Sequence, residues 1–235
     1  MRKRVFFVED DDVIRENYAE LLADAGFEIE AFGDHHAALA CAQESIPDLA
    51  LLDISMNDER DAGFQLCADL RRLSLELPII FLSCHDSEYD KISGIRLGAD
   101  DYLTKDTSLD YLIVRMEALL RRVQILTRKD TGQEREAENN LVRGSLSIEH
   151  GKLAVYWQGQ KVDLTLTQFR ITQELAAYPN QVKSCAKLMK AADIFVEPNT
   201  ITAHIKTIRD RFKAIDPGFE FIKTERGCGY RWVEA

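Results

Sequence analysis

The sequence has few cysteines and no paired cysteine motif. Its five cysteines are odd in number, scattered along the chain and never spaced as C-x-x-C. This pattern favours incidental thiols in a reducing cytosol over a disulfide framework or a thiolate metal site. No apolar run reaches the length of a membrane span, and the first four residues lead into a short apolar segment rather than a signal peptide. We therefore expect a cytoplasmic protein that does not contact membranes.

Positive charge is also scarce, and it is unevenly placed. The chain carries 30 Lys and Arg against 40 Asp and Glu, a net charge of −10. Residues 1–122 have 13 basic and 26 acidic side chains, whereas residues 141–235 have 14 basic and 10 acidic ones, a net +4. A polyanion would therefore bind the second half of the chain rather than the first.

The first half alternates short apolar segments with segments of helical periodicity. One of them, Leu49-Ala50-Leu51-Leu52, is apolar throughout and ends at a single carboxylate, Asp53, which is typical of a strand buried on both faces. The alternation predicts an α/β fold, a doubly wound parallel sheet of five strands, in a domain spanning residues 1–123. Strands are expected at 4–8, 27–31, 49–52, 78–83 and 101–104, and helices at 13–26, 34–45, 64–74, 87–97 and 109–122.

Four of the predicted strands end in residues with related chemistry. The first is followed by acidic residues from Glu9 onwards, the third by Asp53, the fourth ends in Ser83, and Lys105 follows the fifth. An aspartate at a strand end, taken alone, is more often a turn cap. Ligands gather at the carboxyl ends of parallel strands, however, and clustered carboxylates suit Mg²⁺. A hydroxyl and an ammonium at the same place suit a transferred phosphoryl group.

The segments V-E-D-D, L-L-D, F-L-S and G-A-D-D-Y-L-T-K resemble the receiver domain of bacterial two-component response regulators, which has a flavodoxin-like fold. The resemblance implies that Asp53 is the phosphoacceptor. It further implies that Glu9, Asp10, Asp53 and the Ser55 carbonyl hold Mg²⁺, and that Ser83, Tyr102 and Lys105 bind or respond to the phosphoryl group.

This chain departs from the receiver pattern at several points. Asp106 takes the position of the proline that usually follows the lysine, and Asn57 takes the position of another common proline. The loop from Asn57 to Gly63 is also about two residues longer than the family usually has. We expect these differences to affect the access to Asp53 and the lifetime of its phosphorylated form.

Residues 124–140 are polar, of mixed charge and without an apolar period, so they are predicted to be a linker, with the preceding helix able to extend to about residue 128. Residues 141–235 are predicted to form a second domain of short strands and helices. Helices are expected at 165–178, 185–191 and 198–213, strands at 146–148, 153–156 and 162–164, and a final hairpin at 221–233.

The helix at 198–213 has an apolar stripe, and short side chains lie beside basic ones on its other face. A basic helix alone is more often a solvated surface, but this mixture is typical of helices that read the major groove. The segments L-T-L-T-Q-F, T-I-T-A-H-I-K-T-I-R and E-R-G-C-G-Y-R-W resemble the α+β winged helix-turn-helix effector of the OmpR/PhoB class. The DNA contacts expected from residues and resemblance are Asn199, Thr200, Ala203, Lys206, Thr207, Arg209, Arg211 and, in the wing, Arg226.

The two resemblances together imply a response regulator that is not an enzyme. A sensor histidine kinase would phosphorylate Asp53, the receiver would form a homodimer, and the effector would bind double-stranded DNA, with RNA polymerase as a further implied partner. The dimer surface is expected to pair Asp100 and Asp101 of one copy with basic residues of the other, namely Arg115, Arg122 and Lys91. The K-D pair and T-I-T-A-H-I-K also resemble the response regulators of the proteobacterial dedicated sortase system.

Two other functions remain open from the sequence. The first is a DNA-binding regulator with an atypical receiver that works without phosphorylation, as the departures at Asn57 and Asp106 would allow. The second is a phosphatase with an aspartyl-phosphate intermediate. Phosphatases of the haloacid dehalogenase kind carry a second Asp two residues after the nucleophile, and this chain has Ser55 there.

Overall fold

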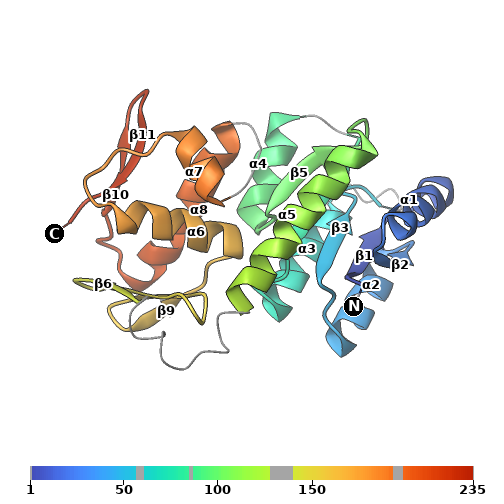
Figure 1. Cartoon of the computed structure of the whole chain (residues 1–235), viewed down its shortest axis with the longest axis horizontal. Helices are drawn as coiled ribbons and strands as arrows, with labels where there is room; N and C mark the ends of the chain where they lie inside the picture. The colour runs from blue at the N-terminus through green and yellow to red at the C-terminus, as the bar shows by residue number, and fades with distance from the viewer. Residues whose placement is uncertain (1, 57–60, 85–86, 128–139, 193–197, 235) are drawn as a thin grey trace. The chain divides into compact units, whose positions relative to one another are not determined.

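The computed structural model describes residues 2–56, 61–84, 87–127, 140–192 and 198–234. The chain divides into two compact units, Met1–Arg121 and Arg122–Ala235, which are described one at a time. Figure 1 labels most of their helices and strands. None of the helices within the described ranges is both long and apolar enough to cross a membrane.

The first unit is built on a sheet of five parallel strands in the order β2-β1-β3-β4-β5, so the predicted doubly wound sheet is confirmed. Helices flank the sheet (Figure 1). The strands are β1 (Arg4–Val8), β2 (Glu28–Phe32), β3 (Leu49–Leu52), β4 (Ile79–Ser83) and β5 (Asp101–Thr104), and the helices are α1 (Asp12–Asp24), α2 (His35–Glu44), α3 (Ala62–Leu73), α4 (Glu88–Leu97) and α5 (Leu109–Thr127).

Strands β1, β3, β4 and β5 are buried on both faces, as their apolar sequences predict, whereas the edge strand β2 is partly exposed. Alternate strand residues such as Leu51 and Leu82 share a core cluster with Leu22 of α1 and Met116 of α5. The intervening residues face the other side, where the Phe81 ring meets the ring of Phe64 of α3 edge-on, with 5.2 Å between centroids. This double burial fixes the strands, so their carboxyl ends make a rigid edge.

The second unit contains a four-stranded antiparallel sheet, three helices and a C-terminal hairpin. Its first strand, β6, was not among the predicted elements. The strands are β6 (Leu141–Arg143), β7 (Leu146–Glu149), β8 (Ala154–Trp157) and β9 (Gln160–Val162), the helices are α6 (Leu166–Ala177), α7 (Cys185–Ala192) and α8 (Pro198–Ile215), and the hairpin is β10 (Ile222–Glu225) with β11 (Gly229–Trp232).

Aromatic side chains hold the second unit together. The rings of Phe212 and Phe219 stack at 4.3 Å, and Trp157 meets Phe219 edge-on at 5.1 Å. The buried contacts therefore join the sheet, the end of α8 and the hairpin that follows it.

The predicted start of α6 is confirmed: Thr165 and Gln168 form a reciprocal capping box.

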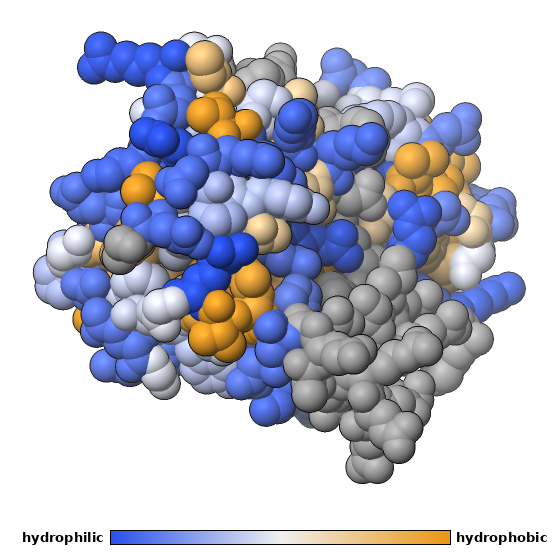
Figure 2. All heavy atoms as spheres, turned by 60° about the vertical axis from the view of Figure 1, so that its left-hand side comes forward, coloured by the Kyte–Doolittle hydropathy of each residue, from blue (hydrophilic) through white to orange (hydrophobic). Residues whose placement is uncertain are grey.

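The predicted linker is described only in part. Residues 124–127 belong to α5, so the helix extends past residue 122, and residues 128–139 lie outside the described residues. Hydrophilic side chains cover most of the face seen in Figure 2, with hydrophobic ones in small separate groups.

Candidate functional site

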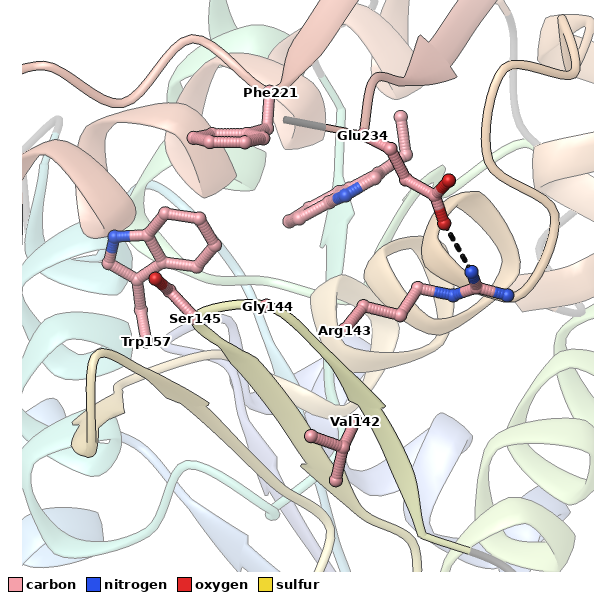
Figure 3. Close-up of a pocket in the computed structure, with 8 residues that line it drawn as sticks. Val142, Arg143, Gly144, Ser145, Trp157, Phe221 and Glu234 are labelled. Carbon is pink, nitrogen blue, oxygen red and sulfur yellow. Dashed lines mark hydrogen bonds and ion pairs between the residues drawn. The ribbon is translucent and has the colours of Figure 1, made fainter.

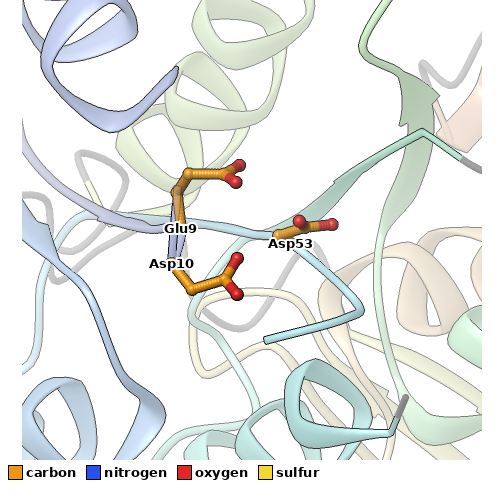
Figure 4. Close-up of side chains that lie close together, drawn as sticks. All are labelled: Glu9, Asp10 and Asp53. Atoms are coloured by element: carbon orange, nitrogen blue, oxygen red, sulfur yellow. The ribbon is translucent and has the colours of Figure 1, made fainter. Parts of the chain in front are cut away.

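Three carboxylates meet at the carboxyl-terminal edge of the sheet. Glu9 and Asp10 directly follow β1, and Asp53 directly follows the neighbouring strand β3. Ligand oxygens of the three side chains all lie within 4.8 Å of one another, and the side chains extend into one space (Figure 4). Glu9 is 1% exposed and Asp53 6%. The cluster that the sequence predicts is therefore assembled, and it is largely buried.

The backbone around Asp53 is held in place on both sides. The Asp53 amide donates to the Val8 carbonyl at 2.9 Å, and one of its own carboxylate oxygens, Oδ1, accepts from the Ile54 amide at 2.7 Å. Gly63 passes so close that a Cβ there would lie 1.9 Å from the Asp53 carbonyl oxygen. Only glycine fits at that position, the second residue of α3, so the first turn of α3 can lie directly against the backbone of Asp53.

Lys105 links two of the carboxylates. Its Nζ lies 2.8 Å from Asp53 Oδ2 and 2.6 Å from Glu9 Oε2. Burial alone would lower the pKa of the Lys105 ammonium, but its hydrogen bonds to Asp53 and Glu9 outweigh burial and raise that pKa. Lys105 is therefore a cation at neutral pH, and it balances part of the negative charge of the cluster.

The backbone of Lys105 is positioned by two neighbouring elements. Its amide donates to the carbonyl of Ser83 at 2.9 Å, and its carbonyl accepts from the Tyr18 hydroxyl of α1 at 3.1 Å. There is no cis peptide bond in the described part of the chain, so the bond between Lys105 and Asp106 is trans. Tyr18 did not emerge from the sequence as a site residue, because its position in α1 resembles that of any core aromatic.

The other predicted receiver residues lie around the same edge. Ser83 ends β4 and is 1% exposed. Tyr102 lies within β5 and is 6% exposed, so its ring points inward in this structure. Ser55 is half-buried two residues after Asp53. The predicted loop at Asn57 and its extra length fall on residues 57–60, outside the described residues.

The donor set suits a hard divalent cation. All three side chains offer carboxylate oxygens, the ligands that Mg²⁺ prefers, and Asp10 is more open to water than the other two. Burial raises the pKa of the Glu9 carboxyl, the hydrogen bond from Lys105 opposes the rise, and the charges of Asp53 and Asp10 add to it. A cluster with excess negative charge of this kind fits a Mg²⁺ ion.

Asp101 and Arg115, which are predicted to pair across a dimer, pair with each other within one chain in this structure. Arg115 Nε donates to Asp101 Oδ2 at 2.7 Å, and both side chains are at most 1% exposed. Their opposite charges were visible in the sequence, but not that α5 turns Arg115 toward β5.

Asp100 is likewise occupied within its own unit. Arg71 of α3 donates to Asp100 Oδ2 at 2.7 Å and to the Gly98 carbonyl at 2.8 Å, while the Ile79 amide donates to the same carboxylate oxygen at 3.1 Å. The predicted contact of Asp100 across a dimer stays a prediction, and in this structure the carboxylate is held within its own unit. Lys91 is half-buried on α4, and the side chain of Arg122 lies outside the described side chains.

The predicted DNA-binding residues of α8 and the hairpin fall into different environments. Lys206, Arg211 and Arg226 are exposed, and Thr207 is half-buried. Thr200 and Ala203 are 8% and 4% exposed, so both are buried in this structure, and their contact with base edges stays a prediction. A short side chain contributes little surface of its own, and the groups around it decide whether it is accessible. The side chain of Asn199 lies outside the described side chains.

Arg209 has a structural partner that the sequence did not indicate. Its guanidinium donates to the Ile222 carbonyl at 2.8 Å and to the Thr224 hydroxyl at 2.9 Å, which ties α8 to the first strand of the hairpin. Burial lowers the pKa of Arg209, and the nearby Tyr230 opposes this. Arg209 therefore fixes the hairpin against α8.

A cavity of about 410 Å³ lies elsewhere in the second unit. Trp157, Phe221 and Trp232 line it, and an ion pair between Arg143 and Glu234 stands at its edge (Figure 3). Trp157 and Trp232 are each 2% exposed and belong to the aromatic core. The cavity is thus mainly a gap beside the core, where the base of the hairpin meets β6 and the turn after it.

Comparisons with known proteins match both units. Residues 5–117 match the family described as response regulator receiver domain, and residues 159–232 match the family described as transcriptional regulatory protein, C terminal. The transcriptional regulatory protein CreB of Escherichia coli strain K12 is 31% identical, over 97% of each chain. The alkaline phosphatase synthesis transcriptional regulatory protein PhoP of Bacillus subtilis strain 168 is 30% identical, over all of this chain and 98% of that protein.

Solved structures agree at the level of the fold. One structure of a RitR mutant covers 99% of this chain and 100% of its own, with a TM-score of 0.76 and 19% sequence identity. A likeness at this identity concerns the fold alone. The function is therefore inferred from the sequence relatives and from the geometry at the sheet edge.

Proposed function

The chain belongs to the OmpR/PhoB-type response regulators, which join a receiver to a C-terminal DNA-binding domain, and from this premise we propose that phosphorylation of Asp53 controls its binding to DNA. The single observation that carries the proposal is the ion pair between Lys105 and Asp53. It puts a cation 2.8 Å from the carboxylate that would receive the phosphoryl group. The same ammonium also pairs with Glu9 at 2.6 Å, so it is held in place at the edge where the phosphoryl group would arrive.

The proposed transfer uses the residues already at the sheet edge. A carboxylate oxygen of Asp53 attacks the phosphorus of a phosphohistidine on a partner kinase. The new P–O bond forms as the P–N bond breaks, and the leaving imidazole takes up a proton. The product, an aspartyl phosphate, brings its oxygens near the Lys105 ammonium and the Ser83 hydroxyl, which supply the charge and the hydrogen-bond donor that it needs.

Glu9, Asp10, Asp53 and the carbonyl of Ser55 would hold Mg²⁺, whose charge when bound offsets that of the incoming phosphoryl group. The protein's own part is to bring the acceptor, the ammonium and the hydroxyl to one place before the donor arrives. In the proposed response, Ser83 moves toward the phosphoryl group and Tyr102 changes its packing.

The proposed output is binding to duplex DNA as a homodimer. Lys206, Arg211 and Arg226 are exposed and basic, which suits contacts to phosphates and, for Arg226 in the hairpin, to a minor groove. We propose that Asn199 and Thr207 contribute to the same surface, that RNA polymerase is a further partner, and that the protein acts in the cytoplasm. In the single chain Asp100 and Asp101 pair with Arg71 and Arg115, so contacts of these residues across the proposed dimer would require the intrachain pairs to rearrange.

The second candidate is the regulator that binds DNA without phosphorylation. It is favoured by the exposed Asp106, which takes the place of a proline common in receivers. The complete set of Glu9, Asp10, Asp53 and Lys105 in one cluster supports the phosphorylated form instead. The K-D pair at Lys105 also supports, as a finer proposal, the resemblance to the regulators of the dedicated sortase system.

The experiment compares DNA binding before and after phosphorylation. The full chain is treated with acetyl phosphate and Mg²⁺, and its affinity for a pool of random duplexes is measured by fluorescence anisotropy, beside Asp53→Ala as control. We expect the donor to tighten binding by the parent and to leave Asp53→Ala unchanged. Tight binding that ignores the donor would support the second candidate, and no binding in either state would contradict both.

A further inference from the structure

Thr202 lies on α8, and its hydroxyl has a defined direction. It is not among the predicted DNA contacts. We infer that Thr202 donates a hydrogen bond to an acceptor on a base edge, and that Tyr230 is the positioning residue that sets the direction of this bond. The inference rests on the proposed DNA binding, and it adds a specificity-determining pair to it.

Thr202 lies on the accessible side of α8. It is exposed, whereas Thr200 and Ala203 beside it are buried. Lys206 lies one turn further along the helix on the same side, and it is exposed as well. A helix that presents Lys206 to DNA therefore presents Thr202 with it. Thr202 and Thr207 are the two short polar side chains nearest to Lys206 among the described side chains of α8. Thr202 is exposed and Thr207 is half-buried, so Thr202 is the more accessible of the two.

Tyr230, the partner of Thr202, is held rigidly in β11. It is 6% exposed. Its amide donates to the carbonyl of Lys183 at 2.9 Å, and its carbonyl accepts from the Lys183 amide at 2.7 Å. Next to it, a Cβ on Gly229 would lie 2.0 Å from the same Lys183 carbonyl oxygen, so the two segments touch at the backbone. The guanidinium carbon of Arg209 lies 5.8 Å from the centre of the Tyr230 ring.

The hydrogen bond between the two hydroxyls gives Thr202 its polarity. The Tyr230 hydroxyl donates to Thr202 Oγ1 at 3.1 Å. A threonine hydroxyl has one proton and two lone pairs, so the bond from Tyr230 takes a lone pair and leaves the Thr202 proton to point outward. Thr202 therefore presents a donor. In the major groove the matching acceptors are O6 and N7 of guanine, N7 of adenine and O4 of thymine.

Thr207, five residues along the same helix, has the opposite polarity. Its hydroxyl donates to the carbonyl of Ala203 at 3.2 Å, so its proton is used within the helix and only lone pairs face outward. The two threonines thus offer different hydrogen-bonding groups to a partner, although the sequence shows the same residue type. Preorganisation by a rigid neighbour also lowers the entropy that Thr202 loses on binding.

A structural role for Thr202 is the competing explanation. A largely buried tyrosine hydroxyl needs a partner, and Thr202 could serve only as that partner. The two roles differ in what they do to sequence preference. Loss of a mere structural partner would weaken binding to all sequences alike, whereas loss of a base-reading donor would lower the preference at particular base pairs.

The experiment selects preferred duplexes from a random pool with the full-length parent and then measures affinity for the best duplex and for each of its single base-pair variants. Thr202→Val removes the hydroxyl and keeps the shape. Thr202→Ser keeps the hydroxyl, and Tyr230→Phe removes only the donor to Thr202. Thr172→Val is the matched control, because the Thr172 hydroxyl is buried on α6 and donates to the Gln168 carbonyl at 2.8 Å. Circular dichroism melting checks that each variant is folded.

We expect Thr202→Val to reduce the preference at one or two base pairs by about fivefold to tenfold. Tyr230→Phe should reduce the preference at the same base pairs by a smaller factor. Thr202→Ser should retain the preference of the parent. Thr172→Val should keep the pattern of the parent. If folded Thr202→Val keeps every preference of the parent, or weakens all duplexes equally, the inference is wrong. If the parent itself binds no duplex, the proposed function fails instead, so the two failures can be told apart.

Discussion

Lys105 Nζ lies 2.8 Å from Asp53 Oδ2, and the Asp53 side chain is 9% exposed. The same nitrogen lies 2.6 Å from Glu9 Oε2. Both residues belong to the cluster that we propose for Mg²⁺, so the ammonium lies among the carboxylates that would hold the ion. We therefore expect the ammonium to stabilise the cluster in the absence of metal and to compete with metal when it is present.

This competition predicts that Lys105→Met binds Mg²⁺ more tightly than the parent. Removing the ammonium leaves the carboxylates without their internal cation, so we expect the dissociation constant to fall about tenfold. Isothermal titration calorimetry measures it directly. Lys3→Met is the matched control, since Lys3 pairs with Asp48 beyond the start of β1, at the opposite end of the strand. An affinity equal to or weaker than that of the parent would show that Lys105 does not compete for these oxygens.

The affinity for Mg²⁺ should also fall as the pH is lowered. This fall should begin at a higher pH than it would if all the carboxyl groups had ordinary pKa values. Burial, with smaller contributions from Asp53 and Asp10, raises the pKa of Glu9 above its usual 4.5 despite the hydrogen bond from Lys105. A metal ion binds the deprotonated form, so affinity should fall as the pH drops through this raised pKa. Calorimetry between about pH 7.5 and 5 tests this expectation. Glu9→Gln should flatten the profile and the exposed Glu16→Gln on α1 should not; equal profiles for all three proteins would be inconsistent with the assignment.

Arg115→Ala should destabilise the first unit by about 3–5 kcal/mol, because it leaves the carboxylate of Asp101, which is 0% exposed, without its charged partner. Urea unfolding followed by circular dichroism gives the free energy of unfolding. Arg121→Ala, at an exposed position of the same helix, is the control and should cost less than about 1 kcal/mol. Equal stability of the two variants would mean that the Asp101 pair contributes little, and would reopen a role for Arg115 between chains.

Much of the fold followed from the sequence because its signals are local. The run from Leu49 to Leu52 is apolar on both faces and ends at Asp53, which is enough to predict a central parallel strand with chemistry at its carboxyl end. Glu9, Asp10, Ser83 and Lys105 could be grouped for the same reason, since parallel strands bring their ends to one edge. The geometry at that edge agrees with this grouping.

The sequence did not indicate side-chain directions that depend on packing between distant segments. Asp100 and Asp101 are adjacent, yet one pairs with Arg71 of α3 and the other with Arg115 of α5, and the sequence holds no sign of which arginine each one meets. The role of Arg209 was missed because its partner, the carbonyl of Ile222, is a backbone group 13 residues away. The opposite polarity of Thr202 and Thr207 likewise arises from neighbours, not from the residue type.

Cys67 gives a prediction about stability at high pH. Burial in α3 raises the pKa of its thiol from 9.0 to about 12. Between these values the folded chain keeps a proton that the unfolded chain has released, so the contribution of this thiol to stability falls as the pH rises through that range. The free energy of unfolding, measured with urea, should decline less steeply between about pH 8.5 and 10.5 for Cys67→Ala than for the parent. A slope identical to that of the parent would contradict it.

The most direct test of the account is the intact mass of the full chain after treatment with acetyl phosphate and Mg²⁺. The carboxylate of Asp53, its ion pair with Lys105 and the neighbouring Glu9 and Asp10 predict one phosphoryl adduct on the parent. The adduct should be absent from Asp53→Ala and from the parent treated without Mg²⁺, and present on Asp69→Ala, which removes a carboxylate from the far half of α3. An unmodified parent beside a known receiver phosphorylated in the same tube would contradict the central claim, as would an adduct that persists on Asp53→Ala.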